Sequence, residues 1–167
     1  MSGELEQIRE SMAAFLNARG VKAVTAWPDG GRSWGDGPAA VVSVRSCQAA
    51  GSGIGDYLGR QTDPDSGAEL EVYGRRLEVR LGLDLWAAGA GGAERLQAAF
   101  DGLLEALRDG EPEGLRIREI TCGETEYDRT TGLMVRRVEA KCGAFLYAAA
   151  EEGSAFLEFE IRGAWKR

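Results

Sequence analysis

The stretch LEVYGRRLEVRLGLDLWA, Leu70–Ala87, decides the fold class, because apolar and polar side chains alternate along it. The side chains expected on one face are Leu77, Val79, Leu81, Leu83 and Leu85. Those expected on the other face are Glu78, Arg80, Asp84 and Trp86. Because successive side chains of a strand point to opposite faces, this alternation predicts a hairpin or one long bulged strand. One of its faces would be buried, and the other would meet water or a partner.

Two segments with helical spacing flank this strand region. Before it, apolar residues recur every three to four positions at Leu5, Ile8, Met12, Phe15 and Leu16, and Gly20 follows them. This pattern predicts an amphipathic helix over about residues 4–19. After it, an apolar stripe is formed by Leu96, Phe100, Leu103, Leu104 and Leu107. A second amphipathic helix is therefore predicted over about residues 92–109.

The remaining segments are predicted to be strands and loops. The strands are expected at residues 21–27, 39–46, 115–121, 133–150 and 155–163, with a polar turn at Tyr127–Gly132. In the long strand 133–150, the inward side chains would be Val138, Ala140, Cys142, Ala144 and Leu146, and the outward ones Arg137, Glu139 and Lys141. Long loops are expected at residues 28–38 and 47–68, where glycine, proline and aspartate gather.

The order of these segments predicts a single α+β domain over residues 1–167, with two helices packed on a mostly antiparallel sheet. A doubly wound parallel sheet is disfavoured because the last strands have no helices between them.

Composition narrows the functional class. The chain has 27 acidic and 20 basic side chains and a net charge of −7, which argues against a nucleic-acid-binding surface. Three widely spaced cysteines are typical of reduced cytoplasmic thiols. No membrane span is expected because no apolar run is long enough, and the polar, acidic start of the chain is unlike a signal peptide. The chain has no histidine, which removes Ser-His-Asp and Cys-His pairs and zinc sites with histidine ligands.

The stretch GSGIGDYLG, Gly51–Gly59, is rich in glycine as phosphate-binding turns are, but it does not have their spacing. Asp56 stands where the third glycine of G-x-G-x-x-G belongs, and no helix is predicted to follow. The nucleophile elbow G-x-S-x-G also fails around Ser52, because Ala50 and Ile54 stand at the glycine positions. We interpret this stretch as a glycine-hinged arm that carries apolar side chains towards a partner surface.

Two acidic stretches are candidates for a calcium site or a catalytic carboxylate set. DPDSGAE, Asp63–Glu69, lacks the glycine and glutamate that an EF-hand loop requires, so an acidic turn is favoured over a calcium site. Glu124, Glu126 and Asp128 form a possible carboxylate set, which near a turn is typical of solvated charges. Cys122 and Cys142 are expected to pack as small apolar side chains. We therefore expect no catalytic residue, no cofactor and no metal site.

Three longer segments resemble a known family. They are DYLGRQTDPDSGAELEVYGRRLEVRLGLDLWA, the helix AERLQAAFDGLLEAL, and GLRIREITCGETEYDRTTGLMVRRVEAKCGAFLYA. In this order they resemble the tail terminator, or tail completion, proteins of contractile-tail phages and prophages of Gram-positive bacteria. The shared pattern is an N-terminal helix, a strand pair, long strands around a second helix, and a YD…G turn before a long strand. No counterpart of residues 28–38 is apparent.

The resemblance implies a structural virion protein. Such subunits form a ring, usually six-fold, on the head-proximal end of the tail tube, where they stop tube polymerisation and offer the surface that joins the head. The implied partners are further copies of the chain, the tail tube protein, the tail sheath and head–tail connector proteins, with assembly in the host cytoplasm. DNA would pass through the lumen without specific binding, and an acidic lining would suit that passage.

Seven residues are expected to form assembly contacts: Trp34, Ile54, Asp56, Tyr57, Leu58, Tyr127 and Asp128. Trp34 lies in a Gly/Pro loop, where an aromatic side chain is typical of a contact with another chain. Two other functions stay open from the residues alone. One is another head–tail connector or neck protein, and the other is a small-ligand-binding or carboxylate-dependent enzyme module.

Overall fold

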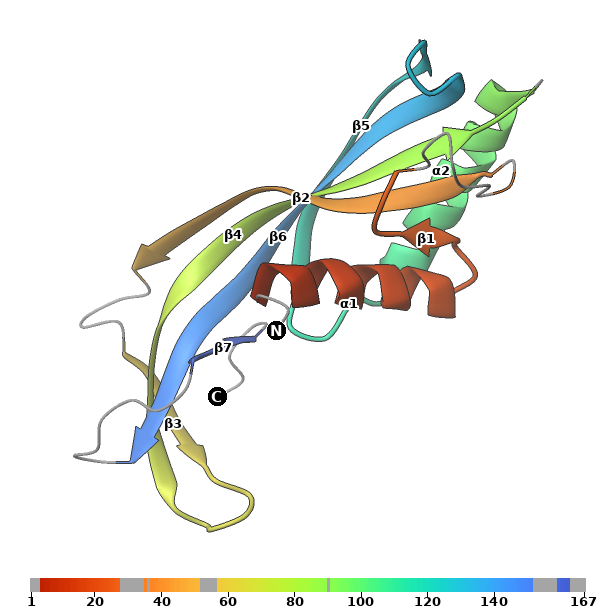
Figure 1. The fold of residues 1–167 in the computed structure, drawn as a ribbon. Helices are drawn as coiled ribbons and strands as arrows, with labels where there is room; N and C mark the ends of the chain where they lie inside the picture. The colour runs from red at the N-terminus through yellow and green to blue at the C-terminus, as the bar shows by residue number, and fades with distance from the viewer. Residues whose placement is uncertain are drawn as a thin grey trace.

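The computed structural model describes residues 4–27, 35, 37–51, 57–89, 91–151 and 159–162. Its elements are α1 (Glu4–Ala18), β1 (Ala23–Val24), β2 (Ala39–Gly51), β3 (Tyr57–Thr62), β4 (Glu69–Ala87), α2 (Gly92–Arg108), β5 (Arg116–Asp128), β6 (Leu133–Glu151) and β7 (Phe159–Arg162). This order confirms the predicted α+β class and both predicted helices (Figure 1).

In the described residues, the strands form one sheet with the order β1-β2-β4-β6-β5, and β3 joins β4 while β7 joins β6. All pairs are antiparallel except β1 with β2. The segment Leu70–Ala87 lies within the single strand β4 and does not fold back as a hairpin. Of the strand predicted at residues 21–27, only Ala23–Val24 pairs with a neighbour.

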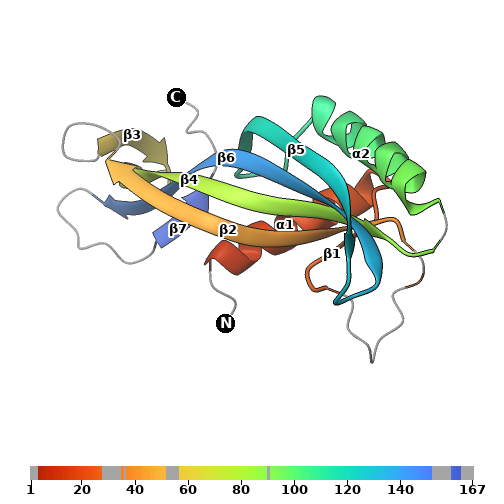
Figure 2. The same cartoon turned by 90° about the horizontal axis from the view of Figure 1, so that it is seen from above.

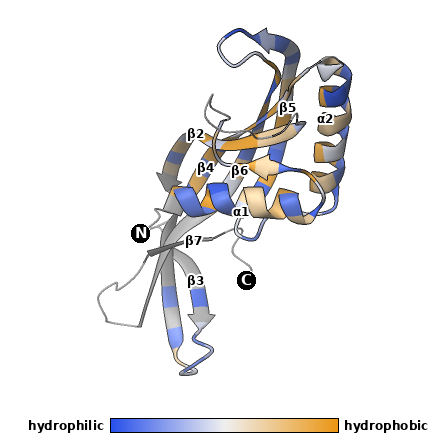
Figure 3. Ribbon diagram, turned by 45° about the vertical axis from the view of Figure 1, so that its right-hand side comes forward, coloured by the Kyte–Doolittle hydropathy of each residue, from blue (hydrophilic) through white to orange (hydrophobic). Residues whose placement is uncertain are grey.

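Both helices cover the same face of the sheet, which we call the helix face. Ile8, Met12 and Leu16 of α1 and Leu96 and Leu103 of α2 are buried in one core with the odd-numbered leucines and the valine of β4. Val138, Ala140, Cys142 and Ala144 of β6 belong to the same core, as predicted. Figure 3 shows apolar colouring where these strands lie beside the helices. The side chain of Leu146 lies outside the described residues.

Asn17 joins α1 to the sheet. Its side-chain amide donates to the carbonyl oxygens of Ala13 at 3.0 Å and Ala23 at 2.9 Å. Its amide oxygen accepts the Ala23 N–H at 3.0 Å. The helix ends where Gly20 takes a φ of 83°, a left-handed conformation that glycine adopts without steric cost. The side chain of Asn17 thus fixes the position of β1 immediately after the helix.

The opposite face of the sheet, which we call the open face, departs from the prediction at one end. Glu78 and Arg80 are exposed, as expected, but Asp84 and Trp86 are buried. Trp86 packs in a second, smaller core with Ala39, Val41, Leu133 and Val135, and Trp27 and Val24 pack against it. The alternation of β4 correctly identified the two faces. It did not reveal that Val24 and Trp27 cover part of the open face at Trp86.

The predicted loop at residues 47–68 is largely wrong. Cys47–Gly51 continues β2 and pairs with β4 from Val79 to Arg75, and Tyr57–Thr62 is β3. Residues 52–56 lie outside the described residues. Small and glycine residues form strand here because β4 offers them a continuous partner, which outweighs their weak strand propensity. The predicted loop at residues 28–38 lies mostly outside the described residues.

The 19-residue strands β4 and β6 pair from Leu70–Glu151 to Ala87–Met134 and extend past the helices. Their far parts, residues 69–76 and 145–151, form with β3 and β7 a projection that we call the β-arm (Figure 1). Figure 2 shows the β-arm at one end of the molecule and α2 with the β5–β6 hairpin at the other. The fold is therefore a helix-covered body with a hairpin at each end of a long sheet.

Candidate assembly interface

The predicted contact residues fall into separate places. Trp34, Ile54 and Asp56 lie outside the described residues. Tyr57 and Leu58 begin β3 in the β-arm, where Tyr57 pairs with Tyr73. Tyr127 and Asp128 end β5, so they belong to a strand rather than to the predicted turn, which occupies residues 129–132. The side chain of Tyr127 is a large apolar group with 62% of its surface exposed.

The two described groups lie at opposite ends of the sheet. Tyr57 is aligned through Tyr73 with Ala148 of β6, whereas Tyr127 pairs with Met134 of the same strand. Met134 and Ala148 are fourteen positions apart in the sequence. At about 3.3 Å per residue, this spacing corresponds to about 45 Å of strand. The structure therefore does not bring Tyr57 and Leu58 into one patch with Tyr127 and Asp128.

The two hairpins have the same turn, built on the pattern Asp-x-x-x-Gly. The Gly67 N–H donates to the Asp63 carbonyl oxygen at 2.8 Å, and the Gly132 N–H donates to the Asp128 carbonyl oxygen at 2.8 Å. Both glycines have a φ of 71°, in the left-handed region. The shared spacing in DPDSG and DRTTG is a sequence signal for a common hairpin turn, and this similarity was not predicted.

The aspartate carboxylates hold these turns. Asp63 Oδ1 accepts the Asp65 N–H at 2.8 Å, and Asp128 Oδ1 accepts the Thr130 N–H at 2.9 Å. Asp128 Oδ2 also accepts the Thr131 hydroxyl at 3.0 Å. These backbone hydrogen bonds stabilise the charged form and are the main reason that the pKa of each carboxyl group lies below its ordinary value. Both acidic motifs thus serve as hairpin turns.

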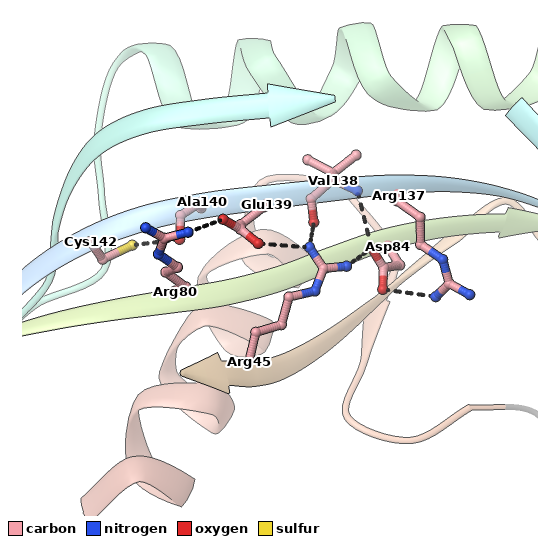
Figure 4. Close-up of polar contacts among 8 residues, drawn as sticks. All are labelled: Arg45, Arg80, Asp84, Arg137, Val138, Glu139, Ala140 and Cys142. Atoms are coloured by element: carbon pink, nitrogen blue, oxygen red, sulfur yellow. Dashed lines mark hydrogen bonds and ion pairs between the residues drawn. The ribbon is translucent and has the colours of Figure 1, made fainter. Parts of the chain in front are cut away.

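A buried carboxylate lies on the open face, near the end of β4 (Figure 4). Asp84, with 4% of its surface exposed, accepts from the guanidinium of Arg45 through Oδ1 and from Arg137 Nη1 through Oδ2 at 3.2 Å. Its Oδ1 also accepts the Val138 N–H at 3.0 Å, and Arg45 Nη1 donates to the Val138 carbonyl oxygen at 3.2 Å. Asp84 and Arg45 therefore satisfy the N–H and the carbonyl group of Val138, so the Asp84 carboxylate helps to hold β4 and β6 together.

A β-bulge positions Arg45 for this task. The register of β2 against β4 shifts between Val44 and Ser46, which turns the extra residue towards the open face. A Cβ atom on Gly82 would lie 2.5 Å from Ser43 Oγ and 3.1 Å from Arg45 Nε. Glycine at this position therefore leaves the space that the Arg45 side chain crosses on its way to Asp84.

The same arrangement recurs in β5. The register of β5 against β6 shifts between Ile117 and Glu119, and the guanidinium of the extra residue, Arg118, lies over Gly143. A Cβ atom on Gly143 would lie 2.9 Å from Arg118 Nε. Arg116 pairs directly with Gly143 from β5, and Glu78 pairs with it from β4. Arg76 is the next residue of β4 on this face.

We call Arg76, Arg116 and Arg118 the arginine cluster. All three are exposed, and their guanidinium groups make no hydrogen bond or ion pair within the described part of the chain. Neighbouring charges on this face do pair. Arg80 lies 3.6 Å from Glu139, and Lys141 lies 3.7 Å from Glu78. The arginine cluster therefore leaves three cations available at the start of β5.

The other end of β5 is acidic. We call Glu124, Glu126 and Asp128 the acidic end. Glu126 and Asp128 pair with Val135 and Leu133, which lie on the same face of β6 as Gly143. The carboxylates of Glu124 and Glu126 are exposed and have no polar partner among the described residues. One edge strand therefore presents opposite charges at its two ends.

No protein-family model matches the sequence, and no curated protein matches it at a significant level. Among the described residues, no group of three or more histidine, cysteine, aspartate or glutamate side chains is placed to hold a metal ion. No described helix has the length and apolar character needed to cross a membrane.

Proposed function

We propose that this chain is a tail terminator protein, which caps the head-proximal end of a phage or tailocin tail tube as a ring of identical copies. The ring would end tube polymerisation and form the surface that joins the head. Its partners would be further copies of the chain and the tail tube protein, with the sheath and the head–tail connector proteins next to them in the virion.

One observation supports the proposal most strongly. Two hairpins with the same Asp-x-x-x-Gly turn lie at the two ends of one long strand pair. A ring needs heterologous contacts, in which one surface of a subunit meets a different surface of the next. A subunit whose sheet offers separate surfaces along about 45 Å of strand meets this need, because its two neighbours can then bind without obstructing each other.

Two further features fit the same role. The order of the elements agrees with the order that the resemblance implies, an N-terminal helix followed by long strands around a second helix. The net charge of −7 suits a wall along which DNA slides, because an acidic chain gains little from contacts with phosphates.

The proposal is tested by deleting the gene in the cell that encodes it. Tail particles are then induced and examined by electron microscopy, with the gene supplied in trans as the control. We expect tail tubes of variable and excessive length that carry no heads, and uniform tails when the gene is restored. Tails of normal length and attachment, or a cell that makes no tail particles with or without the gene, would refute the proposal. Tubes of normal length that lack heads would assign the chain to the neck instead.

A further inference from the structure

We propose that the arginine cluster of one copy of this chain contacts the acidic end of β5 in the next copy. This inference rests on the proposed function, since it names the surface through which ring subunits meet. It assigns a binding role to Arg76, Arg116 and Arg118 and, at the acidic end, to Glu124 and Glu126.

The first step is the charge balance of the two patches. Arg76, Arg116 and Arg118 carry three positive charges, with Glu119 beside them on β5 and Glu78 beside them on β4. Glu124, Glu126 and Asp128 carry three negative charges, with Arg129 next in the chain and Arg137 close enough to lower the pKa of Asp128. The two patches therefore have opposite net charge, and Arg76, Arg116, Arg118, Glu124 and Glu126 are exposed without polar partners in the described residues.

The guanidinium groups of Arg136 and Arg137 bind partners other than Glu124 and Glu126. Arg136 donates to Gln97 Oε1 at 2.6 Å and to the Gly123 carbonyl oxygen at 3.1 Å, and its guanidinium lies over the Phe100 ring. Arg137 is bound to Asp84, and its guanidinium lies 5.3 Å from the centre of the Trp27 ring. These arginines therefore leave the carboxylates of Glu124 and Glu126 available for another chain.

The second step is the separation of the patches within one copy. Arg118 and Glu126 are eight positions apart on β5. Eight residues of strand correspond to about 26 Å, which exceeds the Debye length of about 8 Å at physiological ionic strength. The patches are thus screened from each other inside one subunit. Opposite charges at distant ends of one element favour head-to-tail contact between copies, which is the heterologous geometry that closes a ring.

The third step concerns the type of contact. β5 lies at the edge of the sheet, and its register against β6 shifts between Ile117 and Glu119 and again between Cys122 and Thr125. Bulges of this kind disfavour the addition of another strand to an edge. The contact is therefore made through side chains. A second copy is favoured over nucleic acid because Glu78, Glu119 and Glu139 lie among the cations of this face, where they would repel phosphates.

The test uses charge reversal in the purified full chain. One variant carries Arg116→Glu and Arg118→Glu, and the other carries Glu124→Lys and Glu126→Lys. Matched controls with the same charge changes are Arg19→Glu with Arg108→Glu, and Glu94→Lys with Glu105→Lys, all at exposed positions outside β5. Circular dichroism verifies folding, and sedimentation velocity at low and high salt measures self-association.

We expect the wild-type chain and both controls to associate at low salt and to dissociate at high salt. Each β5 variant should associate more weakly by at least about tenfold, because like charges are brought together. An equimolar mixture of the two β5 variants should recover association, since every contact then joins opposite charges again. Two variants that had lost association because they do not fold would not recover it when they are mixed.

Several results would overturn the inference. These are a wild-type chain that stays monomeric at low salt, β5 variants that associate as the wild type does, and a mixture that stays dissociated. Binding of a DNA oligonucleotide that is lost with Arg116→Glu and Arg118→Glu, while self-association persists, would assign the cluster to nucleic acid instead. The gene-deletion experiment is independent. Overlong tails together with a monomeric wild-type chain would reject this contact and keep the proposed function, and charge-dependent association with normal tails would do the reverse.

Discussion

Removal of the Asp84 carboxylate should destabilise the protein strongly, although Asp84 was expected on a wet face. In Asp84→Ala, the guanidinium of Arg45 and the N–H of Val138 lose their shared acceptor between β4 and β6. Breaking a buried ion pair costs about 3–5 kcal/mol. The side chains of Arg45 and Arg137 are 29% and 55% exposed, so water can partly replace the lost contacts. We therefore expect the lower limit of that range, about 3 kcal/mol.

Urea unfolding, with the slope of the transition compared between variants, measures this loss. For a chain of this size, about 3 kcal/mol corresponds to a fall of about 6–12 °C in Tm. Asp84→Asn should cost less, about 2 kcal/mol, because its amide oxygen can still accept the Val138 N–H and the Arg45 guanidinium, while its amide NH₂ group faces the guanidinium of Arg137. The matched control is Glu78→Ala, which removes an exposed partner 3.7 Å from Lys141 and should cost less than about 0.5 kcal/mol.

A double-mutant cycle separates the pair from its surroundings. Arg45→Ala and Asp84→Ala together should cost less than the sum of the single changes, with a coupling energy of at least about 1 kcal/mol. Two results would refute the reasoning: a cost below about 1 kcal/mol for Asp84→Ala, or additive effects of the two changes, which would mean that the network adds nothing to the joining of β4 and β6.

Two further predictions concern titratable groups. The pKa of Asp128 is lowered by the N–H of Thr130, so its contribution to stability is present above about pH 4 and is lost as the pH falls through the folded-state pKa. An NMR titration that follows carboxyl chemical shifts should show the lowered pKa of Asp128. A midpoint at or above the ordinary aspartate value would contradict it. Asp128→Asn should remove the corresponding titration curve. Burial raises the pKa of the Cys142 thiol to about 12, whereas Cys47 is exposed. A thiol reagent near neutral pH should therefore modify Cys47 in the folded protein and Cys142 only after unfolding, as peptide mass spectrometry can measure, and equal rates would show that Cys142 is not protected.

The candidate interface was predictable only in part. Tyr127 was predicted to make an assembly contact, and the structure leaves its side chain exposed, while the contact itself stays a prediction. The arginine cluster was not predicted, since Arg76 comes from β4 and Arg116 and Arg118 come from β5, about forty residues later. The single signal that the sequence carried was the charge order of β5 itself, with arginines first and carboxylates last.

Elements whose pattern is local were predictable from the sequence. The spacing of Ile8, Met12 and Leu16 and of Leu96 and Leu103 specified two helices, and the alternation from Leu77 to Leu85 specified the buried face of β4. Each pattern depends on periodicity within one segment, because the twofold repeat of a strand and the 3.6-fold repeat of a helix place side chains without reference to the rest of the chain.

The burial of part of the open face and the end of β2 depend on contacts between distant parts of the chain. Asp84 is buried because a bulge in β2 directs Arg45 across Gly82, and β6 brings Arg137 and Val138 to the same carboxylate. The segment Cys47–Gly51 is strand because β4 extends beside it. These features join residues that are about 25 to 95 positions apart in the sequence, and the burial of a charge or the pairing of a weak strand former depends on such partners rather than on local propensity.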